Sequence, residues 1–156
     1  MSEKASVVLK IIHENEVGLL LPCLEELAQH HNIVSTNFKG HYPRIPYEEV
    51  LRDFEQHVKA GKSRIAVVQE ENNIIGFCKC DIEDNKKHGK LDYLAVLKSY
   101  RGNGYGGMLM NWAMDFFRRN EIEKIELRVV EGNETIHLYE KYGFKIASHV
   151  MWKTEV

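Results

Sequence analysis

The sequence has few cysteines, few prolines and almost no net charge, and each shortage excludes a class of protein. Its 156 residues include three cysteines, an odd number that disfavours a disulfide-rich secreted fold and favours a reducing cytoplasm. Lysine and arginine number 21 against 23 aspartates and glutamates, so the net charge is 21 − 23 = −2. Nucleic-acid binders usually carry a strong basic excess, and we therefore expect no nucleic-acid partner.

Long apolar runs are missing as well. No uninterrupted apolar run approaches the ~20 residues that span a bilayer, and the first residues do not read as a secretory signal. We therefore expect a cytoplasmic protein without membrane contact. With only three prolines and no linker rich in Pro, Gly or Ser, residues 1–156 are expected to form a single domain.

Two of the cysteines allow two interpretations. Cys78 and Cys80 alternate along an expected strand and so share one face. A metal or redox pair is one interpretation, but no set of Cys and His residues has the spacing of a zinc site. Small core residues are the simpler interpretation, and we predict that the protein holds no metal.

Hydrophobic periodicity predicts a mixed α/β fold with helices on both faces of the sheet. Apolar, β-branched runs indicate strands at 6–12, 64–70, 74–82, 90–97 and 124–130, and a last extended stretch at 144–154. A tight-turn signal at 71–73 pairs the second and third strands as an antiparallel hairpin. Apolar spacings of i, i+3 and i+4 indicate helices that begin at Val17, include residues 50–58, open at the glycines near Gly104, and follow Asn133.

Four glycines cluster where the fourth strand is expected to lead into a helix: Gly102, Gly104, Gly106 and Gly107. With side chains nearly absent at the start of the helix, several backbone N–H groups can face one ligand. The helix dipole adds roughly half a positive charge there, and Arg101 adds a full one. The cluster therefore predicts a phosphate site.

Two common phosphate motifs do not explain this cluster. A Walker A loop needs Lys and then Ser or Thr after its last glycines, and Gly107 is followed by Met108. The spacing of Gly102, Gly104 and Gly107 matches a dinucleotide fingerprint formally. That fingerprint follows the first strand of a βαβ unit, however, whereas this cluster follows the fourth strand.

The residues around the glycines resemble a known family. The run Arg101-Gly-Asn-Gly104-Tyr-Gly106 resembles the acetyl-CoA pyrophosphate loop of the GNAT superfamily of N-acetyltransferases. Leu94-Ala95-Val96 precedes it, as the fourth strand of that family does. Asn133 and the run from Leu138 to Phe144 resemble the second signature of the family, in the right order and spacing.

The resemblance implies the GNAT fold, in which a mostly antiparallel sheet splays between the fourth and fifth strands. It implies that the pantetheine arm of acetyl-CoA lies in that gap and that the glycine loop holds the pyrophosphate. The residues that it assigns to acetyl-CoA are Leu94, Ala95, Val96, Arg101, Gly102, Asn103, Gly104, Tyr105, Gly106, Gly107 and Asn133.

The resemblance also implies direct attack of an amine on the thioester. Tyr139 matches the position where many members of the family place a tyrosine near the CoA sulfur. Core packing is the alternative for Tyr139, because it shares a helical spacing with Ile136 and Tyr142. For the catalytic base, Asp92 is the first candidate and Glu131 the second.

An N-acetyltransferase for a small amine is the leading hypothesis. The alternatives are a protein or peptide acetyltransferase for lysine or N-terminal amines, and a non-catalytic module that binds acyl-CoA. Arg128 stands where some members that acetylate protein N-termini have a glutamate, which disfavours that subclass. The loop 32–46 is expected to form the acceptor wall, and the sequence leaves both the acceptor and a homodimer open.

Overall fold

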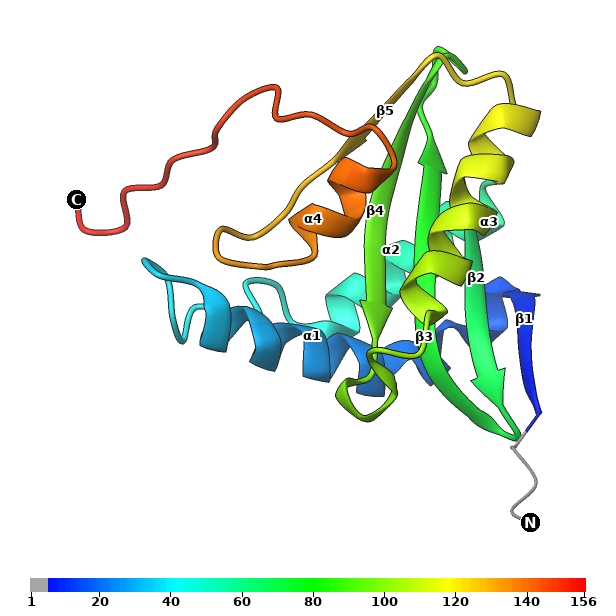
Figure 1. Ribbon diagram of the computed structural model, residues 1–156, viewed down its shortest axis with the longest axis horizontal. Coiled ribbons are helices and arrows are strands. Elements are labelled where there is room, and N and C mark those ends of the chain that lie inside the picture. Colours follow the sequence, from blue (N-terminus) through cyan, green and yellow to red (C-terminus); the bar gives the residue numbers. More distant parts are fainter. Residues whose placement is uncertain (1–5) are drawn as a thin grey trace.

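The computed structural model describes residues 6–156 as a five-stranded sheet flanked by helices (Figure 1). Residues 1–5, where we expect no signal segment, lie outside the described residues. In chain order the elements are β1 (Val7–Ile12), the 3-10 helix η1 (Glu14–Leu20), α1 (Leu21–Val34), α2 (Tyr47–Lys59), β2 (Ser63–Glu70), β3 (Asn73–Ile82), β4 (His88–Val96), the 3-10 helix η2 (Lys98–Tyr100), α3 (Tyr105–Arg119), β5 (Lys124–Leu127) and α4 (Ile136–Lys141).

The strands lie in the order β1-β2-β3-β4-β5. Neighbouring strands are antiparallel except for β4 and β5, which run parallel. The predicted fold class, a mixed α/β structure with a mostly antiparallel sheet, is confirmed. The fifth strand is shorter than predicted, because its ladder with β4 ends at Leu127 and residues 128–130 lie beyond it.

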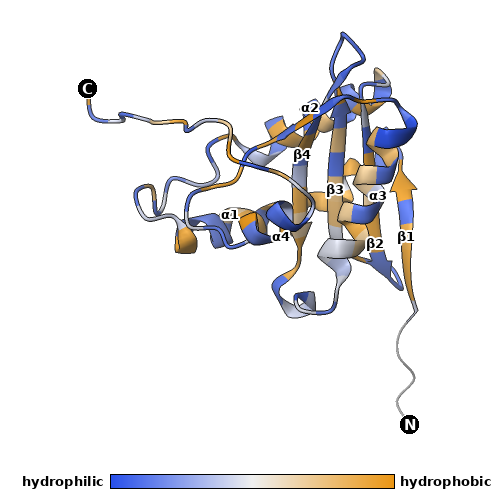
Figure 2. Cartoon of the chain, turned by 45° about the horizontal axis from the view of Figure 1, so that its top comes forward, coloured by the Kyte–Doolittle hydropathy of each residue, from blue (hydrophilic) through white to orange (hydrophobic). Residues whose placement is uncertain are grey.

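Helices cover both faces of the sheet. In Figure 1, α3 lies in front of the sheet and α2 behind it. Because side chains alternate along β3, Phe77 packs with Phe54 on the α1 and α2 side, whereas Cys78 and Cys80 pack with Phe117 on the α3 side. Both cysteines are fully buried free thiols. Figure 2 shows hydrophobic segments along the strands and mostly hydrophilic surface loops. Within residues 6–156, no helix combines the length and the apolar character needed to cross a membrane.

The first helical segment is divided, whereas the periodicity predicts one helix that begins at Val17. The chain forms the 3-10 helix η1 up to Leu20 and begins an α-helix at Leu21. Pro22 explains the position of this boundary. Proline lacks an N–H group and is therefore tolerated in the first turn of a helix but not in its interior.

The C-terminal segment, residues 144–156, contains no assigned helix or strand. Figure 1 shows it leading away from the sheet towards the end marked C. The stretch that was expected to be extended therefore forms no ladder with the described strands. Near its end the segment contacts the body again: the Trp152 ring lies edge-on to Phe38 at 5.0 Å, and the Arg44 guanidinium lies 3.8 Å from the Trp152 ring centroid. The segment thereby touches the loop that is expected to form the acceptor wall.

Gly132 joins the chain that follows β5 to the end of α1. Its φ is +88°, and a Cβ built on it would lie 2.1 Å from the carbonyl oxygen of Val34. Any larger residue would therefore need to push the two segments apart.

We expect Gly132→Ala to lower the free energy of unfolding for this reason. Gly143→Ala is the matched control, because Gly143 has a φ of +92° but nothing lies within 4 Å of an added Cβ. Both variants carry left-handed strain, so the difference between them, about 1–3 kcal/mol in chemical denaturation, measures the clash. Equal losses in the two variants would contradict the contact.

Candidate active site

β4 and β5 pair over a short ladder and then separate. The ladder runs from His88 opposite Lys124 to Leu91 opposite Leu127. β4 continues beyond it to Val96, and in Figure 1 the chain of β5 diverges from β4 along this stretch. The predicted splay of the sheet is therefore present, and it exposes one backbone edge of β4.

The backbone groups of Leu94 and Val96 face this gap. The N–H of Leu97 donates to the carbonyl of Ile75 on β3 at 2.8 Å. Because successive residues of a strand point their backbone groups to opposite sides, Val96 and Leu94 point away from β3. The carbonyl of Val96 accepts a hydrogen bond from Nε of Arg101 at 3.1 Å, which agrees with this direction.

α3 begins without a capping side chain. Its N-cap, Gly104, has a left-handed φ of +86°, and the first bond of the α-helical ladder runs from Met108 N–H to Gly104 O at 3.0 Å. The N–H groups of residues 105–107 therefore have no partner within the helix. A Cβ added to Gly102 or Gly104 would meet nothing within 4 Å, and the first turn carries no acidic residue. These features suit an anion such as a pyrophosphate.

Side chains from three segments meet beside this loop. Asn103 Nδ2 donates to the carbonyl of Tyr100 at 3.0 Å, and Arg101 Nη1 donates to Nδ1 of His30 on α1 at 3.4 Å. Burial and then the charge of Arg101 lower the pKa of His30, and a hydrogen bond with Asn133 opposes both effects. Arg101 and Asn133, which are far apart in the sequence, thus lie at the same end of α1.

Tyr139 lies on α4 and is only 8% exposed. Its ring contacts the edge of Phe144, with the centroids 6.2 Å apart, and it joins the core cluster on the α3 side. Burial, with a smaller contribution from Cys78, raises the pKa of Tyr139 to about 12. The phenol therefore keeps its proton at neutral pH and can act as a hydrogen-bond donor.

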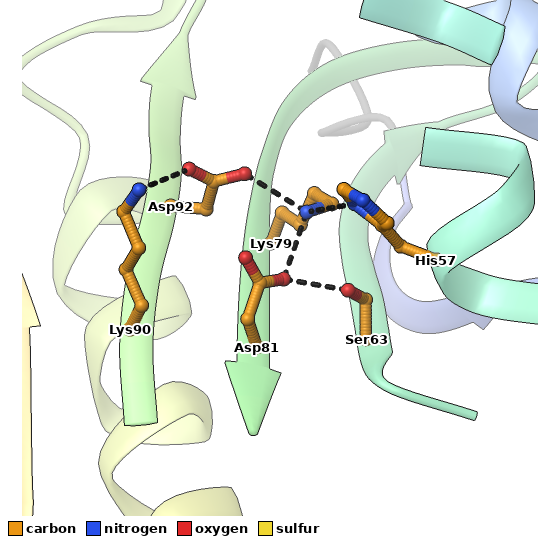
Figure 3. Close-up of polar contacts among 6 residues, drawn as sticks. All are labelled: His57, Ser63, Lys79, Asp81, Lys90 and Asp92. Carbon is orange, nitrogen blue, oxygen red and sulfur yellow. Dashed lines mark hydrogen bonds and ion pairs between the residues drawn. The ribbon is translucent and has the colours of Figure 1, made fainter. Parts of the chain in front are cut away.

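Asp92 lies one residue beyond the last β4–β5 pair, at the apex of the gap. A register shift after Lys79 leaves Asp92 between the pairs that Leu91 and Tyr93 make with β3. Figure 3 shows its carboxylate between two lysines: Oδ2 accepts a hydrogen bond from Lys79 Nζ at 2.8 Å, and Oδ1 lies 3.4 Å from Lys90 Nζ.

Glu131 ties the loop 32–46 to the chain that follows β5. Its carboxylate accepts hydrogen bonds from the Ser35 hydroxyl at 2.6 Å, from Thr36 N–H at 2.9 Å and from Asn37 N–H at 3.2 Å. The Ser35 bond first, and then the two N–H bonds, lower the pKa of Glu131 to about 2. Because its carboxylate is already engaged in these bonds, Glu131 is not placed to serve as the base that we considered second.

A second set of hydrogen bonds holds the far part of the loop 32–46. The Asn32 side chain donates to the carbonyl of Tyr42 at 2.7 Å and accepts from the Tyr42 N–H at 2.9 Å. The His31 ring lies edge-on to Tyr42 at 5.2 Å, and burial lowers the pKa of His31 to about 4. The loop 32–46, expected to form the acceptor wall, is therefore held at two places, by α1 and by the chain that follows β5.

A hollow of about 790 Å³ lies elsewhere, beside the C-terminal half of α3, where Trp112, Phe117 and Ile125 are among the residues that line it. It borders none of the residues expected to bind acetyl-CoA. Among residues 6–156, no three His, Cys, Asp or Glu side chains are grouped so that they could hold a metal ion.

The family model described as Acetyltransferase (GNAT) family matches residues 27–144, which is more than half of the chain. The chain belongs to the GNAT family. The matched range begins within α1 and ends just after α4, so it includes both sides of the gap, the glycine loop and Tyr139.

Similar proteins agree with this assignment to the GNAT family. The chain is 29% identical to spermidine N(1)-acetyltransferase of Vibrio cholerae over 132 residues, which cover 82% of this chain and 75% of that protein. It is 33% identical to the [ribosomal protein bS18]-alanine N-acetyltransferase of Haemophilus influenzae over 75 residues, or 48% of this chain and 50% of that protein. The fold matches aminoglycoside N-acetyltransferase AAC(6′)-Iy, solved in complex with a CoA bisubstrate analog, with a TM-score of 0.71, 14% identity and coverage of 97% and 99%. The chain is thus an acyl-CoA-dependent N-acetyltransferase.

Not every residue expected to bind acetyl-CoA in this GNAT enzyme turns towards the gap. Ala95 pairs with Phe77 on β3 and is buried, so its backbone groups point away from the gap. Tyr105 packs against the core on the α3 side. The Asn133 side chain accepts the Thr135 N–H at 3.1 Å and shapes the turn before α4. The roles of these residues in binding stay predictions.

The residues that surround Asp92 and Arg101 were not predicted from the sequence. The eight histidines carry no spacing signal, so the position of His30 beside Arg101 becomes visible only in the fold. Lys79 gives a faint signal, because it alternates with Phe77 and Asp81 on one face of a strand whose neighbouring residues are apolar.

We expect Gly104→Val to weaken acetyl-CoA binding, because the new side chain would occupy the open space in front of the free N–H groups of α3. The loss of one charge-assisted hydrogen bond predicts a dissociation constant about tenfold higher by titration calorimetry. Gly143→Val is the control for left-handed strain, since Gly143 has a similar φ away from the loop. Unchanged affinity in a folded Gly104→Val variant would refute the pyrophosphate assignment.

We expect Glu131→Gln to destabilise the protein in a pH-dependent way. The folded state lowers the pKa of this carboxyl from 4.5 to about 2, so its ionised form stabilises the fold. The difference in urea midpoint between wild type and variant should be full above pH 4.5 and shrink as the pH falls towards 2. Glu55→Gln on the exposed face of α2 should show no such trend. A difference that did not change with pH would argue against the hydrogen bonds between the Glu131 carboxylate and residues 35–37.

Proposed function

We propose that this GNAT enzyme transfers the acetyl group of acetyl-CoA to the primary amine of a small molecule, by direct attack in a ternary complex. The observation that carries the proposal is the open edge of β4, which runs from the uncapped start of α3 to Asp92. The four residue steps from Val96 to Asp92 extend about 13 Å, the scale of an extended pantetheine arm. An arm laid along this edge would bring the thioester to the apex of the gap.

The similar proteins support a small amine as the acceptor. The Vibrio cholerae relative is named for spermidine, and the AAC(6′)-Iy structure contains an aminoglycoside-like acetylneamine group joined to CoA. Both acceptors are polyamines. A carboxylate at the apex of the gap, such as that of Asp92, suits a cationic acceptor of this kind.

The first chemical difficulty is the charge of the amine. With a pKa of about 10.4, an alkylamine is neutral only about once in a thousand molecules at pH 7. Once neutral, its lone pair attacks the carbonyl carbon of the thioester to form the C–N bond. The proton on nitrogen becomes more acidic as that bond forms, and the Asp92 carboxylate can accept it and pass it to solvent. Proximity within the ternary complex lowers much of the remaining barrier.

The second difficulty is the leaving group. The C–S bond breaks with its electron pair on sulfur, and a hydrogen-bond donor stabilises the resulting thiolate. Tyr139 is suited to this role because its raised pKa, about 12, keeps the hydroxyl protonated. A thiol with a pKa of about 8.5 is the stronger acid, so the phenol donates a hydrogen bond without losing its proton.

A protein acetyltransferase is the second candidate, favoured by the likeness to the ribosomal-protein alanine acetyltransferase of Haemophilus influenzae. The exposed Arg128, just after β5, disfavours an N-terminal amine, because a cation stands where some such enzymes have a glutamate. A non-catalytic module that binds acyl-CoA is the third. The presence of Tyr139 and Asn133 favours an enzyme over such a module.

A panel of acceptors separates these candidates. We would measure release of the CoA thiol with spermidine, an aminoglycoside, a peptide with a free N-terminal alanine, and an N-acetylated peptide that contains lysine. Turnover of the first two, with little or none of the peptides, is the expected result. Faster turnover of a peptide would transfer the function to the second candidate, and binding of acetyl-CoA without any turnover would favour the module.

We expect Tyr139→Phe to lower kcat with little change in the affinity for acetyl-CoA, because the thiolate loses a hydrogen-bond donor. A loss of about tenfold to a hundredfold corresponds to one such bond. Tyr142→Phe is the control, since its hydroxyl bonds to Asn111 at 2.6 Å on α3. An unaltered kcat in Tyr139→Phe would leave Tyr139 a core residue.

A further inference from the structure

Lys79 carries a charge inside the protein. Its side chain is 0% exposed, and the ammonium donates to Asp81 Oδ1 at 2.8 Å, to Asp92 Oδ2 at 2.8 Å and to His57 Nδ1 at 3.2 Å (Figure 3). A lysine has three N–H donors and no acceptor, so these three bonds saturate it. His57 must therefore accept through Nδ1 and carry its proton on Nε2.

The surroundings hold this ammonium in one place. The Ser63 hydroxyl donates to the same Asp81 oxygen at 2.6 Å, and the Phe54 ring centroid lies 5.0 Å from Lys79 Nζ. Buried ionic networks of this kind contribute little to stability compared with apolar residues of similar volume. Stability alone therefore does not account for a buried lysine at this position.

The hydrogen bonds of Lys79 reach Asp92, which lies where β4 and β5 separate. Lys79 occupies Oδ2 of Asp92, whereas Oδ1 has only the longer contact of 3.4 Å to Lys90, whose side chain is 32% exposed. Oδ1 is therefore the oxygen that an acceptor can reach. The Lys90 ammonium lies beside Oδ1 in the position that the acceptor nitrogen would take, and the acceptor would displace it.

We propose that Lys79 is a positioning residue for the acceptor amine: it holds Asp92 with Oδ1 turned to the gap, and its buried charge favours the neutral form of the amine bound there. The proposal rests on the function proposed above. Asp92 alone would favour the charged, unreactive ammonium, and Lys79 offsets that effect. Lys79 neither forms nor breaks a bond in the reaction.

Distance and charge support this role. Since the two oxygens belong to one carboxylate, an amine hydrogen-bonded to Oδ1 would lie roughly 6 Å from Lys79 Nζ. A like charge at such a distance shifts a pKa by about one unit or more towards the neutral amine. The other titratable groups near Asp92 are those of Asp81, Lys90, Tyr93, His57 and Asp53.

The test is the pH dependence of kcat with the amine that the wild type turns over fastest in the acceptor panel. In Lys79→Met we expect the rise of kcat to move about one unit or more to higher pH, and kcat at pH 7 to fall about tenfold. The dissociation constant for acetyl-CoA should stay unchanged. Lys62→Met, which removes an exposed bridge to Asp84 (57% and 91% exposed side chains), should keep the wild-type profile.

A second variant guards against misfolding, since Lys79→Met leaves two carboxylates near one another. Lys79→Met with Asp81→Asn removes one charge of each sign, and we expect a smaller shift in the same direction, because Lys79 is the group that contacts Asp92. A wild-type profile in either folded variant overturns the role of Lys79 while the proposed function stands. A wild-type enzyme that acetylates none of the amines overturns both proposals.

Discussion

The early end of the β4–β5 ladder is the constraint on which the site depends. Parallel pairing stops at Leu91 and Leu127, one residue before the register shift with β3 leaves Asp92 unpaired. Irregularities of this kind increase the local twist of a strand and so favour its separation from a neighbour. The same few residues thus open the gap, free the backbone of Leu94 and Val96, and place a carboxylate at the apex.

The open end of the gap is closed again by contacts outside the sheet. The chain that follows β5 returns to the end of α1, where Gly132 touches Val34 and Glu131 binds the loop that begins at Ser35. The start of α3 bounds the gap at the end of β4, and Arg101 reaches from there to His30. These contacts therefore fix where the chain lies on either side of the gap between the two diverging strands.

The fold and the position of the glycine loop at the start of α3 could be predicted from the sequence because both depend on local patterns. Alternating strands, helical spacings and the glycines at 102–107 are each readable within a short window, and the structure and the family match agree with them. The limits of η1 and β5 were not predictable from periodicity alone. They depend on Pro22 in one case and on where pairing with β4 stops in the other.

The polar environment of the site could not be predicted, because it consists of contacts between distant segments. Glu131 is unremarkable in the sequence, and its bonds to residues 35–37 exist only once β5 lies beside α1. Lys79 is likewise an ordinary strand lysine until a register shift turns Asp92 towards it. Asp92 was identified as a candidate by its place on the fourth strand, but its two lysine partners were not.

If acetyl-CoA completes the free edge of β4, its binding will change backbone amide hydrogen exchange along that strand. With saturating acetyl-CoA, the amides of Leu94 and Val96 should become strongly protected, because the pantetheine arm accepts their hydrogen bonds. The amide of Leu97, already bonded to Ile75 on β3, should change little. Unprotected Leu94 and Val96 amides in the acetyl-CoA complex would show that the pantetheine arm does not bind along this edge.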